Sequence, residues 1–120
     1  MNAVSELYEI EQAPQPGGLK IEAVRNDGKV VLSLVGELDL VSASDLEREL
    51  KAAQTGDTGG VVIDLAGLEF IDSTGLRVLL GAWLRSADGA PPLQFRNAQS
   101  QVRRLFEVAG VLERFSLDGN

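Results

Sequence analysis

The chain has 120 residues, 44% of them hydrophobic and 24% charged, which is the size and composition of one ordinary globular domain. Its formal charge of −7 argues against a surface that binds nucleic acid phosphates or an anionic membrane. The sequence contains no cysteine and no histidine, which excludes disulfides and zinc–thiolate sites and removes the commonest general base and metal ligand.

The first 18 residues are expected to be a flexible leader, because residues 12–18 contain two prolines and two glycines. Their acidic start has neither the basic nor the apolar region of a secretion signal. No apolar run in the chain approaches the roughly 20 residues that span a membrane. We therefore expect a cytoplasmic protein with one folded domain at 19–117 and a short tail at 118–120.

The domain is predicted to begin with a β-hairpin. Residues 19–25 alternate between apolar and polar side chains, as a half-buried strand does. Asn26, Asp27 and Gly28 are typical of a tight turn. Residues 29–36 are almost continuously apolar, so we expect this second strand to lie inside a sheet, antiparallel to the first.

The remaining sequence alternates between helical and extended patterns. Ser44 and Glu47 fit a capping box, which predicts a helix that runs to about Gln54. A short buried strand at 60–65 and a loop at 66–72 are expected to follow.

A second helix is predicted to start at Ser73, because apolar residues recur there at helical spacing. Those expected to face the core are Leu76, Leu79, Leu80, Trp83 and Leu84. A strand at 93–97 and a helix from about Gln99 to a C-cap at Gly110 come next. Residues 111–117 are apolar at alternate positions, which fits either a terminal strand or a helical turn.

This order of elements predicts an α/β fold. Strands that alternate with helices form mostly parallel sheets. We therefore expect a small, mostly parallel sheet of four strands, with one antiparallel edge strand, covered by helices.

Asp72, Ser73 and Thr74 stand where the second helix is predicted to begin. All three are good N-cap residues, so a simple helix cap is one interpretation. The other is a phosphorylation site, because the free N–H groups and the dipole of a helix N-terminus favour a phosphate. Gly75 would then let a kinase or another partner come close.

Several carboxylates are expected at the edge of the sheet where the parallel strands end. They are Glu37, Asp39, Asp64 and Asp72. Paired carboxylates serve acid–base catalysis or bind magnesium. No lysine follows Lys51 and no glycine-rich phosphate loop is present, so solvated acidic loops are favoured over a catalytic, metal or cofactor site.

The outer face of the second helix is a third candidate site. Opposite the apolar stripe lie Thr74, Arg77, Val78, Gly81 and Arg85. Gly81 lowers the stability of a helix by about 1 kcal/mol relative to alanine, and such a glycine often marks close packing. Two arginines in an acidic chain suit either a solvent-exposed face or a surface that docks an acidic partner.

Three segments resemble the bacterial anti-sigma factor antagonists, which are members of the STAS domain family. They are GELDL at 36–40, VIDLAGLEFIDSTGLRVLL at 62–80 and NAQSQVRRLFEVAGVLERF at 97–115. The resemblance covers roughly residues 19–117. It implies a STAS-type fold and a switch that binds other proteins, not an enzyme.

The resemblance also implies a mechanism. Unphosphorylated antagonists bind an anti-sigma factor that is also a serine kinase, and this binding frees a sigma factor. The kinase then phosphorylates the antagonist with ATP and magnesium, the complex separates, and a serine phosphatase restores the antagonist. The phosphorylated residue of this chain would be Ser73.

The family pattern further implies a partner surface around this serine. Its residues would be Asp39, Asp72, Thr74, Gly75, Arg77, Val78 and Gly81. We expect a monomer when the protein is free, with no catalytic residue, cofactor, metal or direct contact to nucleic acid. The alternative is a STAS module that holds a signalling assembly together without a phosphorylation cycle.

Overall fold

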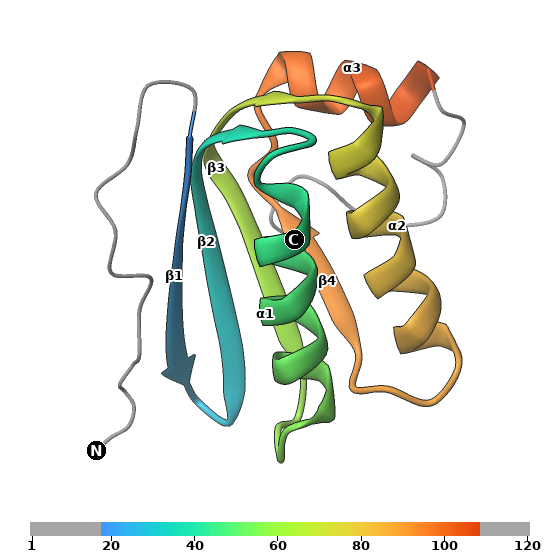
Figure 1. Ribbon diagram of the computed structural model, residues 1–120. Coiled ribbons are helices and arrows are strands. Elements are labelled where there is room, and N and C mark those ends of the chain that lie inside the picture. The colour runs from blue at the N-terminus through green and yellow to red at the C-terminus, as the bar shows by residue number, and fades with distance from the viewer. Residues whose placement is uncertain (1–17, 109–120) are drawn as a thin grey trace.

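Four strands form one mixed sheet in the part of the chain that the computed structural model describes, residues 18–108 (Figure 1). The strands are β1 (Leu19–Asn26), β2 (Lys29–Leu38), β3 (Val61–Ile71) and β4 (Leu93–Arg96). The helices are α1 (Ala43–Thr55), α2 (Ser73–Ala87) and α3 (Ser100–Val108). Apart from Gly18, the predicted leader and tail lie outside the described residues and stay predictions.

β1 and β2 form the predicted hairpin. They pair antiparallel along all of β1, starting with Leu19 opposite Gly36. Asp27 (φ 59°) and Gly28 (φ 81°) both take positive φ, as the two central residues of a type I′ turn require. This turn has the twist that suits two adjacent strands of a hairpin.

The other strand pairs are parallel. The strand order is β1-β2-β3-β4, and β3 runs parallel to both β2 and β4. β1 is therefore the antiparallel strand, and it lies at an edge of the sheet. The fold class predicted from the sequence is confirmed as a single α/β domain with a small, mostly parallel sheet.

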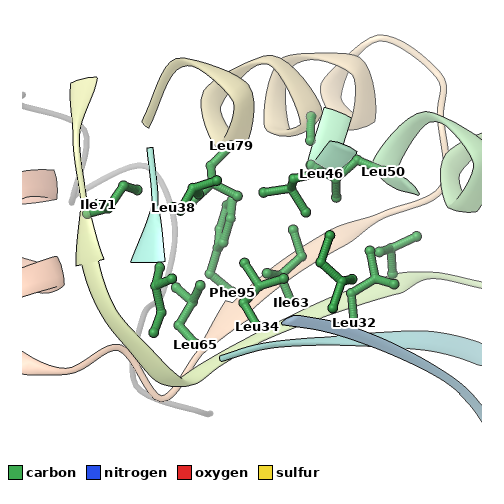
Figure 2. Close-up of a cluster of buried hydrophobic side chains, with 14 of the residues drawn as sticks. Leu32, Leu34, Leu38, Leu46, Leu50, Ile63, Leu65, Ile71, Leu79 and Phe95 are labelled. Atoms are coloured by element: carbon green, nitrogen blue, oxygen red, sulfur yellow. The ribbon is translucent and has the colours of Figure 1, made fainter. Parts of the chain in front are cut away.

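The main core lies between the sheet and the helices α1 and α2, which run side by side across one of its faces (Figure 1). The sheet contributes the fully buried Leu32, Leu34, Ile63, Leu65 and Phe95, and the helices contribute Leu46, Leu50 and Leu79 (Figure 2). Burial of one such side chain stabilises a fold by about 1.5–3 kcal/mol. This packing holds both helices on the sheet and with them the loops that lead into each helix.

β3 is longer than the sequence predicts. The predicted strand at 60–65 is confirmed from Val61 onward, but its predicted end and the predicted loop at 66–72 are wrong, since β3 continues to Ile71. A shift in the register between β2 and β3 lets the pairing continue past this point. A side chain at Gly67 would lie 2.8 Å from Val35 Cγ2, so the glycine serves the close pairing of two strands and not a loop.

Other strand ends differ by one or two residues. β2 continues past its predicted end at Gly36 to Leu38, and β4 ends at Arg96 instead of Asn97. Asn97 has a φ of 65°, a left-handed conformation that stops the strand.

The start of α1 also differs, because its N-cap is Ser42 and the predicted capping box at Ser44 is wrong. The chain turns earlier, at Asp39. The Asp39 carbonyl oxygen accepts hydrogen bonds from the N–H groups of Ser42 and Ala43, at 3.1 and 2.9 Å. Ser44 therefore lies inside the first turn of the helix, where it is exposed.

α2 occupies the predicted region, and its Leu76 and Leu79 are buried as expected. Leu84 was expected to face the core but is 59% exposed, whereas Ala82 is fully buried. The carbonyl oxygen of Ala82 accepts a hydrogen bond from Gln54 of α1 at 2.8 Å. The buried face of α2 therefore includes Ala82, which contacts α1, and does not include Leu84.

α3 begins at Ser100, one residue after the predicted start, and packs against β3. Its predicted end at Gly110 and the undecided segment 111–117 lie outside the described residues.

Candidate functional site

The loops that follow β2 and β3 lie at the same end of the sheet (Figure 1). The two strands are parallel, and their last residues, Leu38 and Ile71, are paired with each other. Asp39 and Asp72 come next in the chain. The structure therefore brings the GELD and DSTG segments together, as the sequence predicts.

Gly36 shapes the end of β2. Its φ is +110°, and any side chain there would overlap the carbonyl oxygen of Gly18. That oxygen accepts a hydrogen bond from the N–H of Glu37 at 2.9 Å. The register with β3 shifts between Gly36 and Glu37, and such a bulge bends the end of a strand. The glycine of GELD thus helps to set the direction in which the next loop leaves the sheet.

Asp39 organises the loop between β2 and α1. Its Oδ1 accepts hydrogen bonds from the N–H groups of Val41 and Ser42, at 3.0 and 3.2 Å. The hydroxyl of Ser42 in turn accepts from the N–H of Asp39 at 3.1 Å and donates to the carbonyl of Glu37 at 3.1 Å. Side chains therefore satisfy the backbone of this short loop and hold it in one conformation.

Asp72 connects the same loop to the start of α2. Its Oδ1 accepts from the N–H of Gly75 at 2.9 Å, which makes Asp72 the N-cap of the helix. Its Oδ2 accepts from the N–H of Leu40 at 3.2 Å. Its own N–H donates to the carbonyl of Leu38 at 3.1 Å. One carboxylate thus holds both segments of the site in position.

Ser73 is the first residue of α2 and is exposed. Within the described residues, none of the hydrogen bonds found involves its hydroxyl group. The sequence offers Asp72, Ser73 and Thr74 as possible N-cap residues, and the structure shows that Asp72 is the cap. Ser73 therefore has a hydroxyl that is free to react, at a helix end where a phosphate is favoured.

Gly75 is buried, in contrast to its expected place in a partner surface. A side chain at this position would lie 2.5 Å from Leu38 Cγ and 3.0 Å from the Leu38 carbonyl oxygen. The close approach at Gly75 is thus made by β2 of the same chain. The absence of a side chain at Gly75 therefore lets the start of α2 pack directly against the end of β2.

The outer face of α2 presents the exposed Arg77 and the half-buried Gly81, whereas Val78 is half-buried and packs in part against the hydrophobic core. A side chain at Gly81 would meet only the guanidinium of Arg85, at an ordinary contact distance of 3.6 Å. Nothing in the described part of the chain therefore packs closely on Gly81. Together with the half-buried Thr74, these residues continue the surface that begins at Ser73.

Arg85 does not belong to this outer face, which corrects the sequence-based expectation. Its Nε donates to Oε1 of the buried Gln54 at 2.9 Å, and its Nη2 atom is buried. Arg85 therefore forms part of the contact between α1 and α2. A helical wheel places it outside because the wheel does not show the neighbouring helix.

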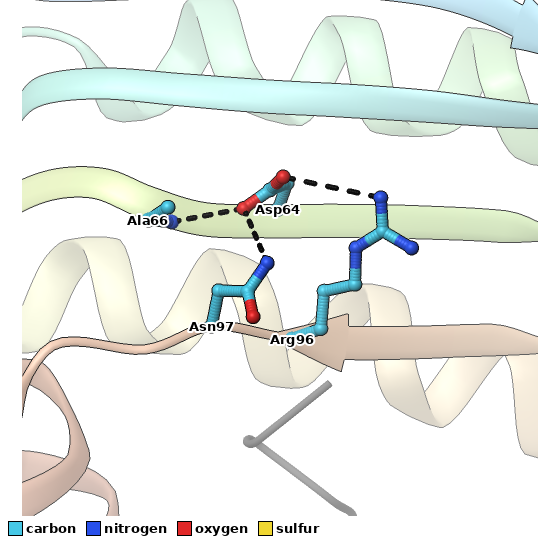
Figure 3. Close-up of polar contacts among 4 residues, drawn as sticks. All are labelled: Asp64, Ala66, Arg96 and Asn97. Atoms are coloured by element: carbon cyan, nitrogen blue, oxygen red, sulfur yellow. Dashed lines mark hydrogen bonds and ion pairs between the residues drawn. The ribbon is translucent and has the colours of Figure 1, made fainter. Parts of the chain in front are cut away.

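Asp64 is also placed elsewhere than expected. It lies within β3 and not at the end of the strand, and it points away from α1 and α2 (Figure 3). Its Oδ1 accepts from the Ala66 N–H at 3.0 Å and from Asn97 Nδ2 at 3.3 Å, and its Oδ2 lies 3.9 Å from Arg96 Nη2. Asp64 therefore connects β3 to the end of β4 and contributes nothing to the site.

The sequence analysis did not single out Leu40 and Val41 as site residues. They are 73% and 85% exposed, and they lie on the loop that Asp39 and Asp72 hold. Their signal in the sequence is two apolar residues directly after the GELD turn, a position where solvent-exposed loops are usually polar.

Two further findings concern metal ions and membranes. Among residues 18–108, no group of three or more acidic side chains is arranged to hold a metal ion. None of the described helices is long and apolar enough to cross a membrane.

Comparisons with known proteins identify the family of this chain. The family model described as "Mlab, STAS domain" matches residues 21–117. BtrV of Bordetella bronchiseptica is 34% identical over 99 residues, which cover 81% of this chain and 84% of BtrV. The anti-sigma-B factor antagonist of Staphylococcus epidermidis is 28% identical over 93 residues, 78% of this chain and 86% of that protein. The crystal structure of an anti-sigma factor antagonist from Mycobacterium paratuberculosis has a TM-score of 0.76 at 27% identity and covers 90% of this chain and 92% of its own.

The fold and the paired GELD and DSTG segments thus define a small α/β domain with two loops joined at one end of its sheet. The chain belongs to the STAS domain family, as its sequence motifs indicate. Its relatives include bacterial anti-sigma factor antagonists, which are regulatory proteins.

Proposed function

We propose that the protein is an anti-sigma factor antagonist that is switched by phosphorylation of Ser73. In its unphosphorylated form it binds an anti-sigma factor that is also a serine kinase, and a sigma factor is released. Phosphorylation ends this binding, and a serine phosphatase restores it. The protein acts in the cytoplasm, is a monomer when free and has no catalytic residue of its own.

The observation that carries this proposal is that Asp72, and not Ser73, caps α2. Asp72 caps α2 with its carboxylate, so the helix does not need the hydroxyl of Ser73. Ser73 is left exposed beside that cap. A kinase can therefore reach the hydroxyl, and modification breaks no hydrogen bond found in the described structure.

The charges around Ser73 explain how a phosphate would stop binding. A phosphoserine carries about −1.5 to −2 charge near neutral pH. Here it would stand next to Asp72 and close to the loop that Asp39 organises. Like charges brought together at an interface weaken binding by several kcal/mol, and each ~1.4 kcal/mol is a factor of ten in Kd. We therefore expect a loss of about a hundredfold or more.

The test purifies each anti-sigma factor with serine kinase activity from the organism that carries the chain and titrates it with the unmodified protein. At least one should bind wild type and Ser73→Ala with similar Kd, and should bind Ser73→Glu far more weakly. The same kinase with ATP and magnesium should place one phosphate on wild type, located at Ser73 by peptide mass spectrometry, and none on Ser73→Ala.

The matched control is Ser100→Glu, because Ser100 is also exposed and is also the first residue of a helix, α3. It adds the same charge in the same kind of position and should leave the Kd unchanged. If Ser73→Glu binds as tightly as wild type, the electrostatic switch is wrong. If no anti-sigma factor binds at all and Ser73 stays unmodified in cells, the chain is instead a STAS scaffold module.

A further inference from the structure

Leu40 and Val41 are unusual among the exposed apolar residues of the described chain. The large hydrophobic residues that are exposed there are Val24, Val35, Leu40, Val41, Phe70, Leu84 and Val108. Leu40 and Val41 are neighbours in the chain and are 73% and 85% exposed. Two consecutive apolar residues are thus exposed on one loop, and we call this pair the apolar projection.

The backbone beneath these two side chains is held by hydrogen bonds. The N–H of Leu40 donates to Asp72 Oδ2 at 3.2 Å, and the N–H of Val41 donates to Asp39 Oδ1 at 3.0 Å. Ser42, which follows directly, is buried, and its hydroxyl accepts from the N–H of Asp39 and donates to the carbonyl of Glu37. A loop whose backbone is held in this way loses little backbone conformational entropy when a partner binds it.

The projection is also tied to the phosphorylation site. One oxygen of the Asp72 carboxylate accepts from the N–H of Leu40 in the loop, and the other accepts from the N–H of Gly75 in the first turn of α2. Ser73 directly follows Asp72 in the chain. Arg77 is exposed one helical turn further on and has no ion pair among the described residues. The surface around Ser73 thus combines an apolar projection with a free positive charge.

We propose that Leu40 and Val41 are the apolar anchor by which the anti-sigma factor binds this chain. The partner would offer an apolar pocket for the two side chains and an acidic group for Arg77. This inference rests on the proposed function and adds the residues that supply affinity, whereas Ser73 supplies regulation. Burial of the two side chains against the partner would remove their apolar surface from water, which favours association.

The test titrates the anti-sigma factor that binds wild type with Leu40→Ser/Val41→Ser. We expect the Kd to rise about tenfold or more, mainly through faster dissociation. Since apolar contacts are not screened by salt, this loss should persist at high ionic strength. The loss caused by Ser73→Glu should shrink under the same conditions, because it is electrostatic.

Val24→Ser is the matched control, since Val24 is 57% exposed but lies on β1, near the hairpin turn at the other end of the sheet. It should leave the Kd unchanged, and circular dichroism should show that all variants are folded. If wild type binds, Ser73→Glu is weakened and the double variant binds like wild type, the anchor is wrong while the proposed function stands. If wild type binds no anti-sigma factor, both the proposed function and the proposed anchor are wrong.

Discussion

Gly75 and Gly81 lie on the same helix, yet their surroundings differ. A side chain at Gly75 would lie 2.5 Å from Leu38 Cγ, in the core, whereas one at Gly81 meets only Arg85 at 3.6 Å. We predict that Gly75→Ala lowers the free energy of unfolding by about 1–3 kcal/mol through overpacking. Gly81→Ala should raise it by about 0.5–1 kcal/mol, because alanine favours the helix. Urea denaturation of both variants measures the two effects.

The comparison of these two glycines contains its own control, because the substitution and the helix are identical. Equal effects of the two substitutions would show that the contact with Leu38 does not decide the stability of the site. Binding can be measured on the same samples. Gly81→Ala adds a methyl group to the proposed partner surface without destabilising the fold, so a weaker Kd would place Gly81 in the interface.

At the scale of single residues, the sequence identifies positions more readily than their roles. The motif around Ser73 contains Gly75, and the sequence suggests close approach there. The neighbour turns out to be Leu38, far away in the chain, which no local pattern reveals. The same holds for Asp72, one of three possible caps in the sequence, whose second oxygen bonds to Leu40.

The contact between α1 and α2 includes a hydrogen bond between the buried Gln54 and the half-buried Arg85. Gln54 is 4% exposed, donates to the carbonyl of Ala82 at 2.8 Å and accepts from Arg85 Nε at 2.9 Å. We predict that Gln54→Leu destabilises the protein by about 1–3 kcal/mol, because the partly buried guanidinium loses its acceptor. Thermal or urea unfolding of purified variants checks this.

A second variant separates loss of the hydrogen bond from loss of packing. Gln54→Leu combined with Arg85→Leu removes both polar partners, and it should recover part of the lost stability. A double variant that is destabilised by the sum of the two single effects would show that the two side chains do not act together.

The elements themselves were largely predictable, because hydrophobic period and turn residues are local signals. The hairpin, the strand–helix alternation and the position of α2 all follow from them. The errors concern features that depend on distant pairing. β3 reaches Ile71 because β2 lies beside it and Gly67 permits their close contact. α1 begins at Ala43 because the turn at Asp39 comes first.

For the whole molecule, the exposed part of the site lies apart from most of the core, although Gly75 and Leu38 join the two. The fully buried side chains lie between the sheet and the helices, whereas the site is built at one end of the sheet from two loops and the start of α2 (Figures 1 and 2). Ser73 is exposed there, and none of the hydrogen bonds found among the described residues involves its side chain. A charge at this point should therefore change recognition and leave the fold intact.

This separation leads to a prediction for Ser73→Glu that binding data alone do not test. The free energy of unfolding should stay within about 1 kcal/mol of wild type, because a negative charge at a helix N-terminus is favourable by 0.3–1 kcal/mol and offsets its repulsion by Asp72. Binding should fall about a hundredfold in the same samples. Urea unfolding and titration, performed in parallel, compare the two. If Ser73→Glu lost both stability and binding, the switch would work by loosening the domain, and the division between a rigid core and a regulated edge would be wrong.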